Sequence, residues 1–294
     1  MTEERSQLRA MLVTNPAAGE RHAKSGDLER CEEILRSAGF VLDRVETGAE
    51  SPTSADLARR AIDQGYEVCI VAGGDGTVAP AAAALLDSSV VLGILPFGSV
   101  MNIANGLGIP LEPVKAAEVI VRRRVIHADA GEVRDKIFFE TAGIGLDAEM
   151  FGAARFVERG DWRRALRRVW RWLTHKSFRV AITVDGREDR QRVLQIYVMN
   201  SPYYGWSLEL LERVSMTDGL LDVAIFPRIG RWALLASLIA VWRGGKLPVR
   251  PLAYRGVRIA IASGDPVAVH ADGAFAGGLP AEFVCRKGAL SVFA

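Results

Sequence analysis

The chain has 294 residues, of which 49% are hydrophobic and 24% charged, so it can form a packed core and is not a disordered protein. Its 37 basic and 35 acidic residues leave a formal net charge of +2, which argues against a dedicated nucleic-acid binder. The length suggests two domains.

The first hundred residues alternate strand and helix signals. Strands are predicted over Leu8–Thr14, Phe40–Glu46, Glu67–Ala72 and Val90–Leu95, and helices over Asp27–Ala38, Ser54–Gly65 and Ala79–Leu86. Strands that are almost entirely apolar, set between helices, indicate a parallel sheet covered on both faces. We therefore predict an α/β domain with a Rossmann-like, three-layer parallel sheet over residues 1–124.

After Arg124 the pattern changes to strands separated by turns. The predicted strands are Val125–Val133, Lys136–Ala142, Phe178–Val184, Val193–Asn200, Leu220–Phe226, Tyr254–Ala262 and Val267–His270. Helical segments interrupt them at roughly 148–174 and 231–243. The pattern predicts an all-β, sandwich-like domain with inserted helices over 125–294, whose last strand, about 286–294, is a candidate to return to the first domain.

Targeting signals are not expected. The charged amino-terminal residues do not resemble a signal peptide. The uncharged stretch Ser88–Leu111 contains proline and four glycines, which would break a membrane-spanning helix. Three widely spaced cysteines suggest neither a disulfide framework nor a metal site. We expect a cytoplasmic protein that is soluble or peripheral to a membrane.

A glycine-rich turn, GGDGT at 73–77, directly follows the third predicted strand. Glycines let backbone N–H groups approach a phosphate closely, and the start of the following helix favours negative charge. A carboxylate such as Asp75 is costly beside phosphates unless Mg²⁺ intervenes or the carboxylate handles a proton. The turn therefore predicts a phosphate site, and a tight structural turn is the alternative.

Two further polar loops are expected at the same edge of the sheet. Asn15–Gly19 follows the first strand and Pro96–Ser99 follows the fourth. Ligands of open α/β sheets bind outside the carboxyl ends of the strands, so the three loops converge on one site. The P-loop, dinucleotide-binding and protein-kinase motifs are absent, so a nucleotide would bind without a P-loop.

The motifs together resemble the diacylglycerol kinase catalytic-domain family, and more closely its bacterial soluble lipid kinases, relatives of sphingosine and ceramide kinases. The resemblance covers most of the chain. Its ordered set is NP at 15–16, GGDGT at 73–77, LGILPFGS at 92–99, LGIP at 107–110, FETAGIGLDA at 139–148, NSPYYG at 200–205, DGLLD at 218–222 and ADG at 271–273. Each motif alone is weak evidence for the family, whereas the full set in this order is specific to it.

The resemblance implies an ATP site between an ATP-binding first domain and a lipid-binding second domain. The nucleotide-binding residues that it implies are Asn15, Thr47, Gly73, Gly74, Asp75, Gly76, Thr77, Gly98, Ser99 and Asn102. It also implies a structural Mg²⁺ at Asp218 with the carbonyls of Ser215 and Leu220, and such oxygen ligands suit a hard cation. A plain hairpin turn is the alternative at Asp218.

The sequence departs from the family at the expected catalytic base. The family's DGE reads DGA here, with Ala274 in place of the glutamate commonly assigned to deprotonate the lipid hydroxyl, and Asn102 replaces the aspartate of the family's GTxND. Asp75 is the first candidate for the base, because the aspartate of this turn has that role in sphingosine-kinase-like relatives. Asp272 is the second. His270 shares a strand face with Asp272 if that segment is extended, and a partly buried structural histidine is the alternative.

The segment 155–176 predicts an amphipathic helix with aromatic and aliphatic side chains on one face and arginines on the other. This pattern is typical of a helix lying in an anionic membrane surface, and a core-packed helix with a solvated face is the alternative. The residues expected to meet membrane or lipid are Trp162, Arg163, Arg167, Trp170 and Leu173.

The sequence thus predicts a lipid kinase that is cytoplasmic and peripherally associated with the inner face of the membrane. It would transfer the γ-phosphoryl group of MgATP to a primary hydroxyl of diacylglycerol, ceramide or a related lipid. No nucleic-acid partner is expected, and a homodimer is left open. The alternative is a catalytically impaired nucleotide- or lipid-binding regulator. A soluble sugar or NAD kinase is a third option, against which the tryptophan–arginine helix argues.

Overall fold

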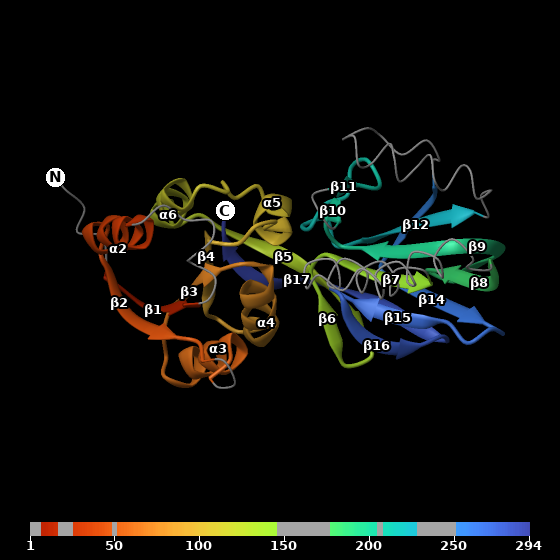
Figure 1. Cartoon of the computed structure of the whole chain (residues 1–294), viewed down its shortest axis with the longest axis horizontal. Coiled ribbons are helices and arrows are strands. Elements are labelled where there is room, and N and C mark those ends of the chain that lie inside the picture. Colours follow the sequence, from red (N-terminus) through yellow and green to blue (C-terminus); the bar gives the residue numbers. More distant parts are fainter. Residues whose placement is uncertain (1–6, 17–25, 49–51, 146–176, 205–207, 228–250) are drawn as a thin grey trace, which may run out of the picture.

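The computed structural model describes residues 7–16, 26–48, 52–145, 177–204, 208–227 and 251–294 (Figure 1). The two predicted helices at 148–174 and 231–243, and with them all five predicted membrane residues, lie outside these ranges. The elements of the first half are β1 (Leu8–Thr14), α2 (Asp27–Ser37), β2 (Phe40–Glu46), α3 (Ser54–Asp63), β3 (Val68–Gly73), α4 (Asp75–Leu85), β4 (Val91–Pro96), α5 (Asn102–Gly106) and α6 (Pro113–Arg122).

The first half is a three-layer α/β structure. Its strands are parallel and lie in the order β2-β1-β3-β4. Helices α2 and α6 cover one face of the sheet, and α3 and α4 cover the other (Figure 1). All of β3 is buried, as expected for a strand with helices on both sides. The predicted α/β fold is confirmed.

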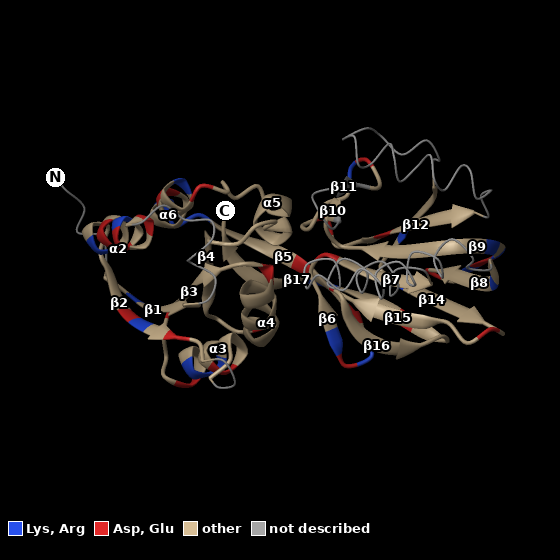
Figure 2. Cartoon of the chain, viewed as in Figure 1, with Lys and Arg blue, Asp and Glu red and all other residues tan. Residues whose placement is uncertain are grey.

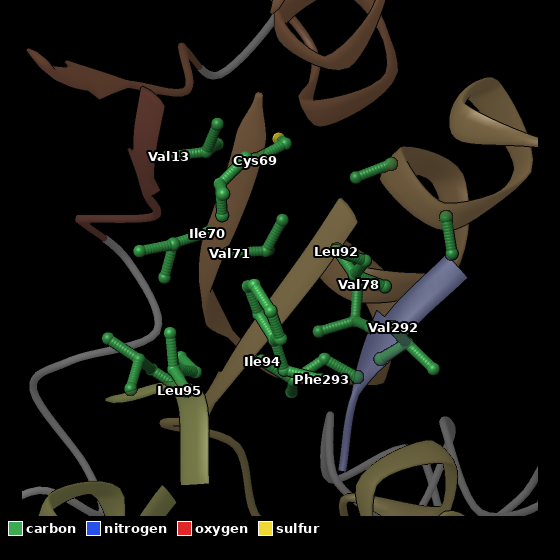
Figure 3. Close-up of a cluster of buried hydrophobic side chains, with 14 of the residues drawn as sticks. Val13, Cys69, Ile70, Val71, Val78, Leu92, Ile94, Leu95, Val292 and Phe293 are labelled. Atoms are coloured by element: carbon green, nitrogen blue, oxygen red, sulfur yellow. The ribbon is translucent and has the colours of Figure 1, made fainter. Parts of the chain in front are cut away.

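The core of this half includes the end of the chain. Val13, Ile70 and Ile94 from three neighbouring strands pack in one apolar cluster with Val292 and Phe293 (Figure 3). All five side chains are almost fully buried, so the last residues stabilise the first half through the hydrophobic effect.

The second half is a β-structure built mainly from antiparallel pairs, and its sandwich-like character is as predicted. Its own apolar cluster includes Phe138, Ile182, Ile196 and Phe283. The strands are β5 (Val125–Val133), β6 (Lys136–Phe138), β7 (Thr141–Gly145), β8 (Phe178–Val184), β9 (Arg187–Met199), β10 (Tyr203–Tyr204), β11 (Leu208–Glu209), β12 (Leu221–Pro227), β13 (Leu252–Gly256), β14 (Arg258–Ser263), β15 (Ala268–Ala271), β16 (Ala274–Gly278) and β17 (Ala281–Phe293).

Strand β17 connects the two halves. It pairs antiparallel with β14 and β5, and at its end Val292 pairs in parallel with Leu92 of β4. The carboxyl terminus therefore lies beside β4 (Figure 1). The division into domains 1–124 and 125–294 stays a prediction. None of the helices in the described ranges is long and apolar enough to span a bilayer.

The structure differs from the sequence prediction at four places. Helix α4 begins at Asp75, before the predicted start at Ala79, although its glycine and Pro80 are poor helix formers. The predicted strand Lys136–Ala142 is two strands, separated by Phe139 and Glu140. The sequence analysis predicts no helix over 102–122, where the structure has α5 and α6. The long strand predicted over 254–262 is also two, β13 and β14.

Candidate active site

The glycine turn after β3 forms the start of α4 and packs directly on the loop after β4. Gly74 is the N-cap of α4 and Asp75 its first residue. A Cβ atom on Gly98 would lie only 2.4 Å from the Cα of Gly74, so only glycine at 98 permits this backbone contact. The amino end of a helix presents backbone N–H groups and positive potential, which suit a phosphate.

The predicted nucleotide residues lie at the carboxyl ends of the four parallel strands and in the loops and helix starts that follow them. The side-chain amide of Asn15 donates a hydrogen bond to Thr77 Oγ1 at 3.0 Å, which joins the loop after β1 to α4. The backbone N–H of Thr47 donates to the carbonyl of Thr14 at 2.9 Å. Ser99 is exposed in the loop after β4. The structure gathers these loops, and their contact with a nucleotide stays a prediction.

Asp75 caps the neighbouring helix α5. Its Oδ2 accepts the backbone N–H of Asn102 at 3.0 Å, and its Oδ1 accepts that of Ile103 at 3.2 Å. The residue before α5, Met101, has a φ of 57°, a left-handed conformation that is strained for a non-glycine residue. Burial raises the pKa of Asp75, and the backbone N–H groups oppose that rise.

Glu140 is a site residue that the sequence analysis missed. It lies between β6 and β7, is partly exposed, and its Oε2 accepts a hydrogen bond from the side-chain amide of Asn102 at 2.7 Å. Burial, followed by the charges of Asp272 and Asp75, raises the pKa of Glu140 to about 8. The available signal was an acidic residue inside the FETAG motif, within an otherwise apolar stretch.

Asp272 fixes the backbone around Glu140. Its carboxylate accepts the N–H groups of Phe139 at 2.7 Å, Glu140 at 3.0 Å and Thr141 at 2.9 Å. Burial raises its pKa to about 6, against the effect of these three donors. The three bonds explain why one predicted strand is divided at this point. The catalytic role predicted for Asp272 stays a prediction.

The segment around His270 is not extended as far as Asp272. Strand β15 ends at Ala271, and Asp272 has a φ of 43° in the turn that follows, so His270 and Asp272 are not alternate residues of one strand. The ring of His270 instead packs edge-on against Phe275, with centroids 5.7 Å apart, and burial lowers its pKa. This geometry favours the structural interpretation of His270.

Asn200 also fixes this segment through hydrogen bonds. The carbonyl of Glu140 accepts the backbone N–H groups of Asn200 at 3.0 Å and Ser201 at 3.1 Å. The buried side-chain amide of Asn200 donates to the carbonyls of Phe139 and Asp129, both at 3.0 Å. Acidic residues lie at the start of α4 and beside β5, the first strand of the second half (Figure 2). Asp75, Glu140 and Asp272, which we call the acidic cluster, come from three separate parts of the chain.

The predicted Mg²⁺ site belongs to a different turn. Asp218 Oδ1 accepts the N–H of Leu220 at 3.1 Å, and its Oδ2 pairs with the Arg255 guanidinium at 3.0 Å. The Ser215 hydroxyl lies 3.2 Å from that of Thr217. Asp218 is thus ion-paired with Arg255, an arrangement that the alternative of a plain turn also accounts for. Within the described ranges, no three His, Cys, Asp or Glu side chains are arranged to hold a metal ion. The Mg²⁺ ligand set stays a prediction.

Comparison with known families matches almost the whole chain. Residues 9–133 match the family described as the diacylglycerol kinase catalytic domain. Residues 143–294 match the family described as the YegS C-terminal NAD kinase beta sandwich-like domain. The first match contains the glycine turn and α5, and the second contains Asn200 and Asp272.

Curated relatives are similar over most of their length. A diacylglycerol kinase of Bacillus subtilis is 25% identical over 287 residues, covering 94% of this chain and 93% of its own. A diacylglycerol kinase of Mycobacterium tuberculosis is 27% identical over 292 residues, covering 95% and 93%. A probable lipid kinase, YegS-like, of Pseudomonas putida is 28% identical over 233 residues, covering 74% of each chain.

Solved structures share the fold. The crystal structure of a diacylglycerol kinase from Bacillus anthracis superposes with a TM-score of 0.76 over 97% of this chain and 96% of that chain, at 21% identity. At this identity the likeness concerns the fold alone, and it agrees with an α/β half followed by a β-sandwich half.

Proposed function

The chain belongs to the family that joins a diacylglycerol kinase catalytic domain to a YegS-type C-terminal domain, and we propose that it is an ATP-dependent lipid kinase. It transfers the γ-phosphoryl group of MgATP to a primary hydroxyl of diacylglycerol, ceramide or a related lipid. Relatives named as diacylglycerol kinases and as YegS-like lipid kinases support this class of reaction.

One observation carries the proposal: a glycine turn with close backbone packing lies next to carboxylates from both halves of the chain. Phosphoryl transfer depends mainly on positioning and on stabilising charge, with little covalent work for the protein. The amino end of α4 supplies N–H groups for phosphate oxygens. Mg²⁺ bound with the nucleotide offsets the negative charge of the phosphates during transfer.

In this proposal the loops after β1, β2, β3 and β4 bind the nucleotide. The hydrogen bond between Asn15 and Thr77 fixes one side of the phosphate site. The close backbone contact of Gly74 with Gly98 fixes the position of the glycine turn. Asp75 is the first residue of α4, and it orients α5 by accepting two of that helix's backbone N–H groups. Different residues of this chain thus bind the nucleotide, orient the site and accept the proton of the lipid hydroxyl.

We also propose that the enzyme acts in the cytoplasm, at the inner face of the membrane. The support is the amphipathic sequence of residues 155–176 together with a lipid acceptor, which does not leave a bilayer freely. Flotation with vesicles of anionic lipid tests this point: the protein should float, and replacing both Arg163 and Arg167 with alanine should weaken flotation. Flotation equal to that with neutral vesicles would contradict it.

The function is tested by incubating the protein with ATP labelled on its γ-phosphate and a panel of diacylglycerol, ceramide, sphingosine and phosphatidylglycerol in mixed micelles. We expect label in an organic-soluble product with diacylglycerol or ceramide. Nucleotide binding by calorimetry without label in any lipid would instead support the non-catalytic regulator.

A further inference from the structure

We propose that the carboxylate of Glu140 accepts the proton of the acceptor hydroxyl, a catalytic role that rests on the lipid kinase function proposed above. Three carboxylates form the acidic cluster, and they differ in how far their oxygen atoms are already engaged. The structure assigns the proton to the one that keeps an oxygen available.

Asp75 and Asp272 are both engaged by the backbone. Each of the two oxygens of Asp75 accepts an N–H group of α5. The oxygens of Asp272 accept three N–H groups between them. Such bonds stabilise the ionised form of a carboxylate and make it a weaker proton acceptor. These two residues therefore act as positioning residues.

Glu140 is engaged at one oxygen only. Its Oε2 accepts the amide of Asn102, while its Oε1 accepts no hydrogen bond from the described part of the chain. The residue is partly exposed. For this proposal, a ligand must be able to reach Oε1. A general base needs this combination of a fixed side chain and an available oxygen.

The position of Glu140 is fixed before any ligand binds. Its backbone N–H is held by Asp272 and its carbonyl by Asn200 and Ser201, while Asn102 holds the side chain. A catalytic group has to be kept within a fraction of an ångström of its working position. Four contacts on one residue provide that rigidity, and all of them come from residues distant in the sequence.

The hydroxyl oxygen of the lipid forms a bond to the γ-phosphorus, and the bond from that phosphorus to the β–γ bridging oxygen breaks. The bridging oxygen leaves with the electron pair as part of ADP. The hydroxyl proton moves to Glu140 Oε1 and is later released to water. No oxidant, reductant or further reactant is needed.

Burial, and after it the neighbouring groups, set the proton affinity of Glu140. Asp75 faces it from α4 and Asp272 from the turn between β15 and β16, and both raise the pKa, whereas the Asn102 amide from α5 lowers it. A base with a pKa near the working pH combines an adequate ionised fraction with a strong drive to accept a proton. The rate should therefore rise with pH through about 8, where Glu140 is half ionised, and level off at higher pH.

The test compares the whole wild-type protein with Glu140→Gln in the labelled-ATP assay, across neutral and alkaline pH. Glutamine keeps the size of the side chain and can still accept the Asn102 bond, but it cannot accept the proton. We expect kcat to fall by roughly 10²–10⁴-fold and its rise with pH to disappear. Calorimetry should give the same affinity for MgATP. Glu118→Gln, an exposed glutamate on α6, is the matched control and should behave as wild type.

The outcomes separate this inference from the function on which it rests. If wild type phosphorylates a lipid and Glu140→Gln keeps its kcat and pH dependence, Glu140 is not the base and the kinase function stands. If wild type phosphorylates no lipid, both proposals fail. If Glu140→Gln is less stable than wild type at alkaline pH, the residue is structural and the proposal is overturned. Glu140→Asp should retain the rise with pH at a reduced kcat.

Discussion

The side-chain amide of Asn102 donates a hydrogen bond of 2.7 Å to the carboxylate of Glu140, and the backbone N–H of the same asparagine donates to Asp75 at 3.0 Å. Asn102 begins α5 in the first half, whereas Glu140 lies between β6 and β7 in the second. One buried residue thus connects the glycine turn with a carboxylate of the opposite half. A change in the angle between the halves would alter the contact with Glu140, whereas the contact with Asp75 lies within the first half.

Replacing Asn102 with alanine should raise the pKa of Glu140 further, because the lost hydrogen bond favours the ionised carboxylate. The rise of kcat with pH should then shift to higher pH, and kcat near neutral pH should fall several-fold. A pH–rate profile measures this shift. Asn105→Ala, on the same short helix, is the control and should leave the profile in place. An unshifted profile for Asn102→Ala would show that this bond does not tune Glu140.

Replacing Asp75 with asparagine removes one of the acceptors that cap α5 and the charge beside the phosphate site. We expect a loss of phosphotransfer of at least about 10²-fold, because positioning carries most of this reaction. The residual activity should still rise with pH, since Glu140 remains, but the rise should shift to lower pH because the charge of Asp75 no longer raises the pKa of Glu140. Asp63→Asn, at the exposed end of α3, is the control. A flat pH profile in Asp75→Asn would indicate that Asp75, and not Glu140, is the general base.

Replacing Gly98 with alanine should disturb the phosphate site through a backbone clash. The new Cβ would lie 2.4 Å from the Cα of Gly74, so the two loops must separate. Such overpacking costs about 1–3 kcal/mol, and the affinity for MgATP should fall with it. Calorimetry and thermal unfolding measure the two effects. Gly264→Ala, where nothing lies within 4 Å of the new Cβ, should change neither.

The acidic cluster should make the protein less stable as the pH rises. The folded-state pKa of Glu140, about 8, is above its ordinary value of 4.5, so the folded state binds more protons than the unfolded state between these values. Stability therefore falls as the pH increases through this window. Glu140→Gln abolishes that loss of stability. Its free energy of unfolding should therefore equal that of wild type in acid and exceed it above about pH 8.

The size of this effect follows from the linkage. One pKa unit corresponds to about 1.4 kcal/mol. For a chain of this length each kcal/mol gained raises Tm by roughly 2–4 °C. Thermal unfolding of wild type and Glu140→Gln at acid and alkaline pH measures the difference without any nucleotide or lipid. A difference in Tm between the two proteins that stays constant with pH would contradict the elevated pKa of Glu140.

Much of the fold could be predicted from local patterns. The bounds of β1, β2, β5 and β8 agree with the sequence prediction, because each is an apolar or alternating run that ends at a glycine, a turn or a helix start. Helix α4 could not be placed correctly, because its glycine and proline mask a helix that is stabilised by packing of Val78, Ala81 and Ala82 in the core.

The site was only partly predictable. The glycine turn and the loops beside it could be located, because the carboxyl ends of parallel strands meet at one edge. Glu140 could not, because its position depends on Asp272, 132 residues later in the chain, and on Asn102, 38 residues earlier. Such contacts leave no periodic signal in the sequence.

The central claim places the triphosphate of ATP at the start of α4, between the two halves and within reach of Glu140. A crystal structure with Mg²⁺ and a non-hydrolysable ATP analogue tests it most directly. We predict phosphate oxygens on the backbone N–H groups of the turn at 73–77, with the γ-phosphate towards Glu140. A nucleotide bound elsewhere, with this turn empty, would contradict the account.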